Sequence, residues 1–575
     1  MDITNDNFVK QLPKIIETIQ DCDFIAIDTE LSGLMREKSL NRFDLPEERF
    51  AKSVESSRGY FIMQFGLSCF TRVEDLHYTN RTYNFYIFPQ QNKFHGDINR
   101  TFSLQAHAIQ FLSEHGFDFN KLFKHGVSYL TFQEKKLLTA QLKSDLKAKS
   151  KVEFDRQGVP NFVPTSMTNY CRAMIKKVNE FTEKRRSAHL GGEMVTEANS
   201  NLSISTNNSE DPGCEIDDPA ISIEDRLELR DCSTNHRRTL MKRVIDCLPT
   251  ADNLLVTEQC IADTNETYLV VDYMDKKVKN ERLKRALILS KGFLEVIEMI
   301  IVHKKPVVGH NLTLDLIQII NQFMEPLSSD YNSFKETCQS LFPLIYDTKH
   351  IAHSILDPKT LTQNQSRLND LYCQLKNSTS FPTLKVDPIG VYFDENQLPH
   401  QAGYDAYMSG YCFIVLCEAY VRSCTGAKHK QSKTDDSSKP LPLSKCKQVV
   451  DEFSNKIHLS YSYDYKYFDL SREEHKPDRD HVFYMEFPSS WALEDLFQVF
   501  QAYGGVEVSR LDKTSALCAL RDRRHTREVM EKAKNLTKSN YKIYPYETYL
   551  VDYKAMRKRR AISDNDNGDV EFSAV

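Results

Sequence analysis

The sequence has 575 residues, more than one hydrophobic core can use, so its length predicts several domains. It is 40% hydrophobic and 27% charged, with a formal net charge of −5. This charge excludes a uniformly basic nucleic-acid-binding protein, so any basic surface must be local. No stretch approaches the roughly 20 apolar residues of a membrane helix, so we expect no membrane partner. The 14 Cys residues include no CxxC pair, which is typical of reduced thiols and not of a metal site.

Strand signals come first along the chain, and helix signals follow. Three runs rich in β-branched and aromatic residues predict strands at Phe24–Ile27, Tyr60–Phe70 and Tyr83–Phe88. Apolar residues from Leu312 to Phe323 recur on one helical face, and Tyr404–Val421 is apolar nearly all round, which predicts a buried helix. This order indicates an α/β core assembled from distant segments.

Two polar segments lack any periodicity. Residues 187–226 are rich in Ser, Asn, Glu and Asp, and residues 425–447 mix Lys, Ser, Asp and Pro. Neither segment can bury enough apolar surface to offset the entropy of an ordered chain. We therefore predict a disordered loop at the first segment and a linker at the second.

Asp28 and Glu30 follow the first predicted strand and stand two residues apart. Side chains at i and i+2 of a strand point to the same face, so the two carboxylates would lie side by side. Burying like charges is costly unless a cation compensates them, and a shared divalent metal would do so. The alternative is that the strand has ended and both acids face water. This spacing alone favours the alternative.

Two further acids stand near the starts of predicted helices. Asp315 follows a Gly-His-Asn turn, and alone it would be a first-turn residue that favours the helix dipole. His400 precedes the helix that carries Asp405. This spacing suits an acid that binds metal and a His that accepts a proton from the attacking water. The full series, acid-x-acid, acid, then His-x4-Asp, is the DEDDh exonuclease pattern, and the joint match outweighs the separate structural interpretations.

Longer stretches resemble the poly(A)-specific ribonuclease family over nearly all of residues 1–550. The matching stretches are DFIAIDTELSGL, FDLPEERF, QFGLSCF, NFYIFP, GFDFNKLFKHGVSYL, VGHNLTLDL, LFPLIYDTK and HQAGYDAYMSG. The resemblance implies an α/β, RNase H-like core with a mixed sheet flanked by helices. It also implies that Asp28, Glu30, Asp315 and Asp405 bind two Mg²⁺ ions, which Mn²⁺ can replace, and that His400 is the general base.

Further residues are implied to bind substrate. In the family, residues directly after the first acids hold the terminal adenines, and these positions are Leu31, Ser32 and Leu34 here. Apolar contacts would stack or pack on bases without reading their edges. Lys349 in the DTK motif is a candidate phosphate contact, and an ordinary surface lysine is the equal alternative.

The resemblance also predicts how the chain divides into domains. Where the family inserts a nucleic-acid-binding domain of the R-3-H type, this chain has a basic cluster at His236–Arg238 and a strand-like run at Thr267–Val271. The predicted parts are a nuclease domain at 1–155 and 291–424, an R-3-H-like insertion at 156–290, a linker at 425–447, an RRM-like domain at 448–550 and a tail at 551–575.

The RRM-like domain departs from the family pattern. The family stacks a Trp on the 5′ cap, but Arg510 stands at that position, and the sole Trp of the chain is Trp491. The strand Ser515–Leu520 also lacks the paired aromatic residues of an RNA-binding strand. These departures argue against cap binding and leave folding or dimerisation as alternative roles. The basic run Arg557–Arg560 is either a nuclear import signal or a solvated terminus.

The resemblance implies that the substrates are single-stranded RNA 3′ ends, above all poly(A), and that the product is 5′-AMP. It implies a homodimer located in the nucleus and the cytoplasm. One alternative is a piRNA or small-RNA 3′-end trimmer of the same family, a group that typically ends in a membrane helix. The other is a catalytically silent RNA-binding scaffold, against which the five filled catalytic positions argue.

Overall fold

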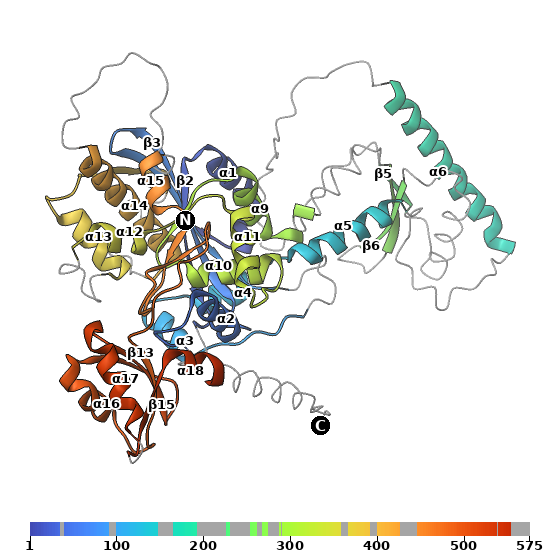
Figure 1. Ribbon diagram of the computed structural model, residues 1–575. Helices are drawn as coiled ribbons and strands as arrows, with labels where there is room; N and C mark the ends of the chain where they lie inside the picture. The colour runs from blue at the N-terminus through green and yellow to red at the C-terminus, as the bar shows by residue number, and fades with distance from the viewer. Residues whose placement is uncertain are drawn as a thin grey trace. The chain divides into compact units, whose positions relative to one another are not determined.

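The computed structural model describes most of the chain and forms two compact units (Figure 1). The described residues are 1–34, 40–90, 99–147, 165–191, 226–229, 254–260, 267–273, 287–288, 290–357, 366–390, 400–425, 446–536 and 539–553. The first unit comprises Met1–Gln90, Asn99–Val127 and Val296–Val575, and the second comprises Gln91–Ile98 and Ser128–Glu295. Among the described residues, we find no helix whose length and apolarity would let it cross a bilayer.

A nine-stranded main sheet organises the first unit, in the order β1-β4-β3-β2-β8-β9-β11-β12 with β10 beside β4. Its strands are β1 (Asp2–Ile3), β2 (Phe24–Leu31), β3 (Ile62–Glu74), β4 (His77–Tyr86), β8 (Val307–Gly309), β9 (Ile345–Asp347), β10 (Lys385–Pro388), β11 (Lys456–His458) and β12 (Tyr467–Asp469). Strand β3 runs antiparallel to β2 and β4, whereas β2, β8 and β9 run parallel. This mixed sheet confirms the predicted α/β, RNase H-like fold.

Helices surround this sheet. They are α1 (Asn5–Asp21), α2 (Pro46–Ser57), α3 (Ala106–Glu114), α4 (Phe119–His125), α9 (Leu294–His303), α10 (Thr313–Ile319), α11 (Tyr331–Leu341), α12 (Thr348–Ile355), α13 (Leu368–Asn377), α14 (Ala402–Thr425) and α15 (Lys447–Phe453). Helix α14, orange in Figure 1, packs on β2 and β3 and shares their core through Phe24, Phe70 and Phe413. The nearly all-round apolar pattern of α14 is therefore that of a buried helix.

The predicted helix at Leu312–Phe323 has two parts. Helix α10 ends at Ile319 and continues as a π-helical turn, Ile320–Met324. In this wider turn, the buried Gln322 accepts a hydrogen bond from the backbone nitrogen of Ile62 at 2.6 Å. A side-chain contact across the core therefore accompanies the change of helix type.

The second unit contains α5 (Phe132–Lys147), α6 (Thr165–Gly191) and a three-stranded sheet in the order β5-β7-β6. Its strands are β5 (Arg226–Leu229), β6 (Leu254–Cys260) and β7 (Thr267–Tyr273). The longer segment of this unit begins at Ser128, before the predicted boundary at 156, and includes α5. Helix α6 extends to Gly191, so the segment predicted as disordered at 187–226 overlaps its last turn and the start of β5. The rest of that segment and the basic cluster at His236–Arg238 lie outside the described residues.

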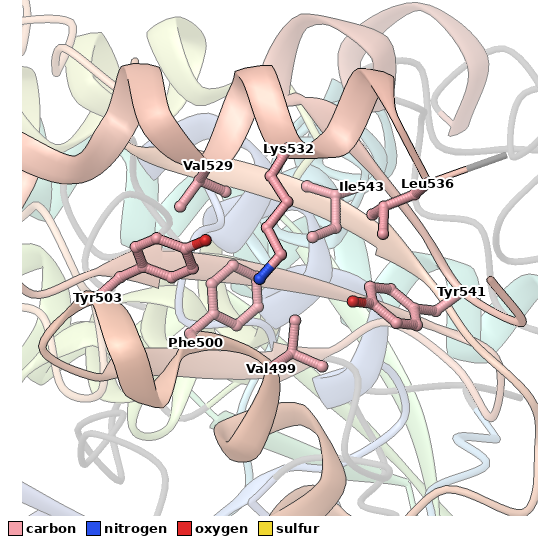
Figure 2. A pocket seen from close by; sticks show the side chains of 8 residues that line it. All are labelled: Val499, Phe500, Tyr503, Val529, Lys532, Leu536, Tyr541 and Ile543. Atoms are coloured by element: carbon pink, nitrogen blue, oxygen red, sulfur yellow. The ribbon is translucent and has the colours of Figure 1, made fainter. Parts of the chain in front are cut away.

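A four-stranded sheet near the C-terminus has the order β14-β15-β13-β16. Its elements are β13 (Val482–Glu486), α16 (Leu493–Phe500), β14 (Val506–Arg510), β15 (Ser515–Leu520), α17 (Thr526–Lys534), β16 (Lys542–Pro545) and α18 (Tyr546–Thr548). One face packs under α16 and α17 and encloses a cavity of about 10 Å³, lined by Tyr503, Lys532 and six other residues (Figure 2). Such a cavity has room for one water at most.

The opposite face of this sheet, carrying Tyr484, Leu517 and Ala519, is also covered. Phe43 and Tyr463, which lie outside the four-stranded sheet, pack against it together with Tyr546 and Tyr549. We call this surface the closed sheet face. Typical RRM domains stack bases on aromatic side chains of their sheet. Here the corresponding face is occupied by the protein itself.

Hydrogen bonds and an ion pair tie β14 to the segment that precedes α2. Arg42 pairs with Glu507 at 2.8 Å, and the Asn41 side chain donates to the carbonyl oxygen of Arg510 at 3.3 Å. The RRM-like domain was predicted to begin at 448, but α15, β11 and β12 come before it and the strands β11 and β12 extend the main sheet. The four-stranded sheet starts at β13, because β11 pairs with β9 instead. The predicted linker at 425–447 and the tail at 551–575 lie largely outside the described residues.

Candidate active site

Asp28 and Glu30 lie where the central strand β2 leaves the core. Phe24–Ile27 are buried, whereas Asp28 and Glu30 are partly exposed. The register is regular up to Glu30, which pairs with Gln64, and then shifts between Glu30 and Leu31. This irregularity lets the strand turn away after the second acid. The two carboxylates are therefore held on a rigid strand at the edge of the buried core.

Asp315 occupies the first turn of α10 and is buried. The turn before this helix is fixed by Asp347, whose carboxylate accepts hydrogen bonds from the backbone nitrogens of Asn311 at 2.9 Å and Leu312 at 3.2 Å. Thr29 donates its hydroxyl hydrogen to Asp315 Oδ1 at 2.6 Å. Asp315 is thus fixed to β2 directly and to β9 through its own turn.

The start of α14 carries Asp405 and is held against the main sheet by two amides. The backbone nitrogen of Ala402 donates to Gln64 Oε1 at 2.9 Å, and that of Gly403 donates to Asn84 Oδ1 at 3.1 Å. These bonds satisfy two of the nitrogens that an α-helix leaves without partners at its N-terminus. Gly66 pairs with Asp28 across the sheet, and a Cβ there would collide with the backbone of Ala402. The helix can approach β3 this closely only because residue 66 is glycine.

Burial raises the pKa values of all four acids, and neighbouring carboxyls raise those of Asp28 and Glu30 further. Burial raises the pKa of Asp28 well above its usual value, and the carboxyls of Asp405, Asp315 and Glu30 raise it further. Burial and the same two aspartates raise the pKa of Glu30. Burial also raises the pKa of Asp315 to about 6 and that of Asp405 to about 7. The charged groups that raise these pKa values are themselves carboxyls. When the cluster is ionised, its negative charge is therefore not balanced by these neighbours.

This deficit fits a divalent cation. Glu30, His400 and Asp405 each offer one ligand atom, and the three atoms lie within 4.8 Å of one another. Asp28 and Asp315 add carboxylates: Asp28 interacts electrostatically with Glu30 and Asp405, and Asp315 interacts with Glu30. A set dominated by carboxylate oxygens suits the hard cations Mg²⁺ and Mn²⁺. The structure therefore brings together all five positions that the sequence nominated for catalysis, and their individual roles stay predictions.

His400 lies just before α14 in an uncommon backbone conformation, with φ at +77°. Its backbone nitrogen donates to Asp405 Oδ1 at 3.4 Å. Its ring packs edge-on against the rings of Phe111 and His115, with centroid distances of 4.6 and 4.4 Å. Burial lowers the pKa of His400, and the neighbouring His115 lowers it further. A neutral imidazole, the form that can accept a proton, is favoured by both effects.

The predicted substrate residues differ in accessibility. Leu34 is 57% exposed, whereas Leu31 and Ser32 are buried. The Ser32 hydroxyl donates to the carbonyl oxygen of Ser103 and accepts from the backbone nitrogen of Phe61. Leu31 and Ser32 therefore support the segment that follows β2 from inside the protein, and only Leu34 of the three presents its side chain to solvent. Lys349 is partly buried in the first turn of α12, and burial lowers the pKa of its ammonium group.

Sequence reasoning missed several residues that position the acids. Asp347 is fully buried and also accepts from the backbone nitrogen of His458 at 2.9 Å. Gln64 and Asn84 anchor α14, and Thr29 bonds Asp315. The one available signal was an acid, Asp347, at the end of an apolar run in a stretch that was already singled out. Nothing in the spacing indicated the roles of Gln64, Asn84 or Thr29.

Comparison with known sequences places this site in a family. The sequence model described as "CAF1 family ribonuclease" matches residues 3–413, which include all five positions predicted to be catalytic. The chain belongs to the CAF1 ribonuclease family. A second model, described as "RNA binding domain", matches residues 472–552 of this CAF1-family chain, around the four-stranded sheet.

Similar proteins cover almost the whole chain. The poly(A)-specific ribonuclease PARN of Homo sapiens is 29% identical over 572 residues, which cover 96% of this chain and 80% of that protein. The pre-piRNA 3′-exonuclease trimmer of Bombyx mori is 27% identical over 570 residues, which cover 96% of this chain and 94% of that protein. A solved structure of S. pombe Pop2p in its Mg²⁺- and Mn²⁺-bound form is 14% identical, covering 73% of this chain and 91% of that one with a TM-score of 0.30.

Proposed function

We propose that this CAF1-family ribonuclease is a 3′→5′ exoribonuclease that shortens poly(A) tails and releases 5′-AMP. The observation that carries the proposal is the convergence of Asp28, Glu30, Asp315 and Asp405 beside His400, with carboxyl pKa values that burial raises at all four acids. The similarity of nearly the whole chain to poly(A)-specific ribonucleases supports the choice of substrate.

In this proposal, the four carboxylates hold two divalent cations, Mg²⁺ or Mn²⁺. When bound, such ions lower the pKa of water and stabilise charge on the leaving oxygen. Thr29 and Asp347 keep Asp315 in place, and Gln64 and Asn84 keep Asp405 in place. His400 accepts the proton of the attacking water through a ring nitrogen. The neutral state favoured by burial and by His115 keeps that nitrogen available.

Two residues outside the acid cluster are proposed to meet the RNA. Leu34 would pack on a terminal base, since its exposed side chain lies three residues after the end of β2. Lys349 would contact a phosphate, since its backbone nitrogen donates to Asp347, which fixes the turn before Asp315. Apolar packing reads no base edges, so we expect the preference for adenosine to be graded.

A second candidate function is 3′-end trimming of small RNAs. The observation in its favour is the match to the Bombyx mori trimmer, which extends over 94% of that protein. Both functions require the same chemistry and differ in the sequence of the RNA end.

A homodimer and a location in the nucleus and the cytoplasm remain proposals that rest on the family resemblance. For the dimer, sedimentation at enzymatic concentrations gives the mass. Cap binding is not proposed, because Arg510 contacts the Phe487 ring and donates to the Trp491 carbonyl oxygen instead of offering an aromatic face.

The proposal is tested with two 5′-labelled single-stranded RNAs, one ending in adenosines and one in mixed sequence. Each is incubated with the protein and with its Asp28→Ala variant, in Mg²⁺ and in EDTA. We expect Mg²⁺-dependent ladders from the 3′ end that the variant loses, with faster loss of adenosines. Equal trimming of both RNAs would favour the trimmer. Absence of cleavage in Mg²⁺ would overturn the exonuclease proposal.

A further inference from the structure

The ring of His400 is supported in an unusual way. A catalytic imidazole is commonly oriented by a hydrogen bond from its second nitrogen to a carboxylate or a carbonyl. Within the part of the chain that the structure describes, no such bond reaches the ring of His400. The ring instead packs against Phe111 and His115, with interplanar angles of 72° and 78°. Ring packing thus takes the place of the usual orienting bond.

The His115 ring is itself fixed. Its Nδ1 lies 2.7 Å from the carbonyl oxygen of Phe111, and because a carbonyl can only accept, Nδ1 carries the hydrogen. The two rings also contact each other, with centroids 4.2 Å apart. We call Phe111 and His115 the α3 clamp. Phe111 is 42% exposed and Leu112 next to it is buried, so helix α3 is anchored on one side and presents the clamp on another.

The other end of α3 is bonded to the loop that follows the catalytic strand. The backbone nitrogen of Gln105 donates to the carbonyl oxygen of Ser32 at 2.8 Å, and its side-chain oxygen accepts from the backbone nitrogen of Leu34 at 2.9 Å. Ser32 lies two residues beyond Glu30 on the same chain segment. Helix α3 therefore connects the strand that carries two metal-binding acids with the residue that acts as base.

We propose that His115, together with Phe111, positions the imidazole of His400 for proton transfer. His115 is a positioning residue here: it acts through His400 and does not touch the reacting atoms. The inference rests on the proposed function, in which His400 is the base. General-base catalysis contributes about 10²–10⁴-fold, and small misplacements lose a large part of it.

The test compares His115→Ala with His115→Phe, which keeps a ring, and His115→Gln, which keeps polarity without a ring. His107, an exposed histidine on α3, provides the matched control His107→Ala. We expect His115→Ala to lower kcat about ten- to hundredfold with KM for RNA within about twofold. His115→Phe should return kcat to within about threefold of wild type, and His107→Ala should match wild type. Should the Ala variant not fold, an active Phe variant beside an impaired Gln variant is the expected result.

A double-mutant cycle with His400→Ala, measured in single turnover, separates positioning from other roles. If His115 acts through His400, adding His115→Ala to His400→Ala costs nothing further. A loss that persists in the His400→Ala background, a change in KM alone, or wild-type kcat in His115→Ala would each overturn the inference. Wild-type kcat in His400→Ala would instead refute the proposed role of His400 itself.

Discussion

The close approach of α14 to β3 makes a specific prediction for Gly66→Ala. A Cβ at residue 66 would lie 2.6 Å from the backbone nitrogen of Gly403 and closer still to the carbonyl group of Ala402. Real Cβ atoms essentially never approach another atom within 3.0 Å, so the Gly403 contact alone is 0.4 Å too short. Because the obstacle is helix backbone, the start of α14 must retreat, and it carries His400 and Asp405 away from Asp28.

Overpacking of this kind costs about 1–3 kcal/mol of stability. A displacement approaching 1 Å at a catalytic group can lower the rate about 10²-fold. We therefore expect a folded Gly66→Ala variant whose kcat falls by about ten- to hundredfold. The assay combines single-turnover cleavage of a 5′-labelled oligoadenylate with urea unfolding.

The matched control is Gly126→Ala. A Cβ there would lie 2.5 Å from the carbonyl oxygen of Leu122, at the end of α4. This variant should lose comparable stability while it keeps wild-type kcat. The reasoning is refuted if Gly66→Ala retains wild-type kcat, or if both variants lose activity in proportion to their stability.

Three further predictions concern the acids. Asp28→Asn should lower turnover by more than about 10³-fold. It should nevertheless stabilise the protein in EDTA by about 1 kcal/mol or more, since it removes one of several repelling carboxyls. Thermal unfolding with and without Mg²⁺ measures the change in stability. The raised pKa values of Asp315, about 6, and Asp405, about 7, mean that the unfolded chain ionises first. The contribution of Asp315 and Asp405 to stability in EDTA should therefore be most favourable below about pH 4 and should fall as the pH rises to 7. Mg²⁺ should reverse this trend. A stability that does not change with pH in EDTA would contradict the raised pKa values. Asp347→Ala should lower the free energy of unfolding by about 3 kcal/mol or more, since several backbone nitrogens lose their buried acceptor. The kcat of this variant should fall by a larger factor than its affinity for RNA measured without Mg²⁺.

Sequence reasoning succeeded where one local pattern decides the structure. The apolar run Phe24–Ile27 sufficed to predict a buried strand that leads to Asp28 and Glu30, but placing the two acids in a shared site needed the full series of five residues. The apolar composition of Tyr404–Val421 likewise predicted a buried helix with Asp405 near its start. In each case, an apolar run within one segment is enough to indicate that the segment is buried.

The contacts that align these elements were not predictable in this way. Gly66 is a glycine inside an ordinary strand pattern, and only the arrival of Ala402 from a distant segment gives it a role. Asp347 has the appearance of a strand-end acid, but it serves as the acceptor for the turn before Asp315. Such contacts depend on how helices and strands pack, and the periodicity within one segment does not indicate which distant segment will pack against it.

The closed sheet face affects how this protein can be truncated and how its C-terminal domain can be fused to another protein. Phe43 and Tyr463, together with Tyr546 and Tyr549, seal an apolar surface of the C-terminal domain. If the chain were cut before β13, Phe43 and Tyr463 would be left facing water, and a clustered apolar patch of that kind favours self-association. If the C-terminal domain is fused to another enzyme, that enzyme must supply side chains that cover the same surface in place of Phe43 and Tyr463. The nuclease domain and the C-terminal domain can therefore be exchanged between relatives only together.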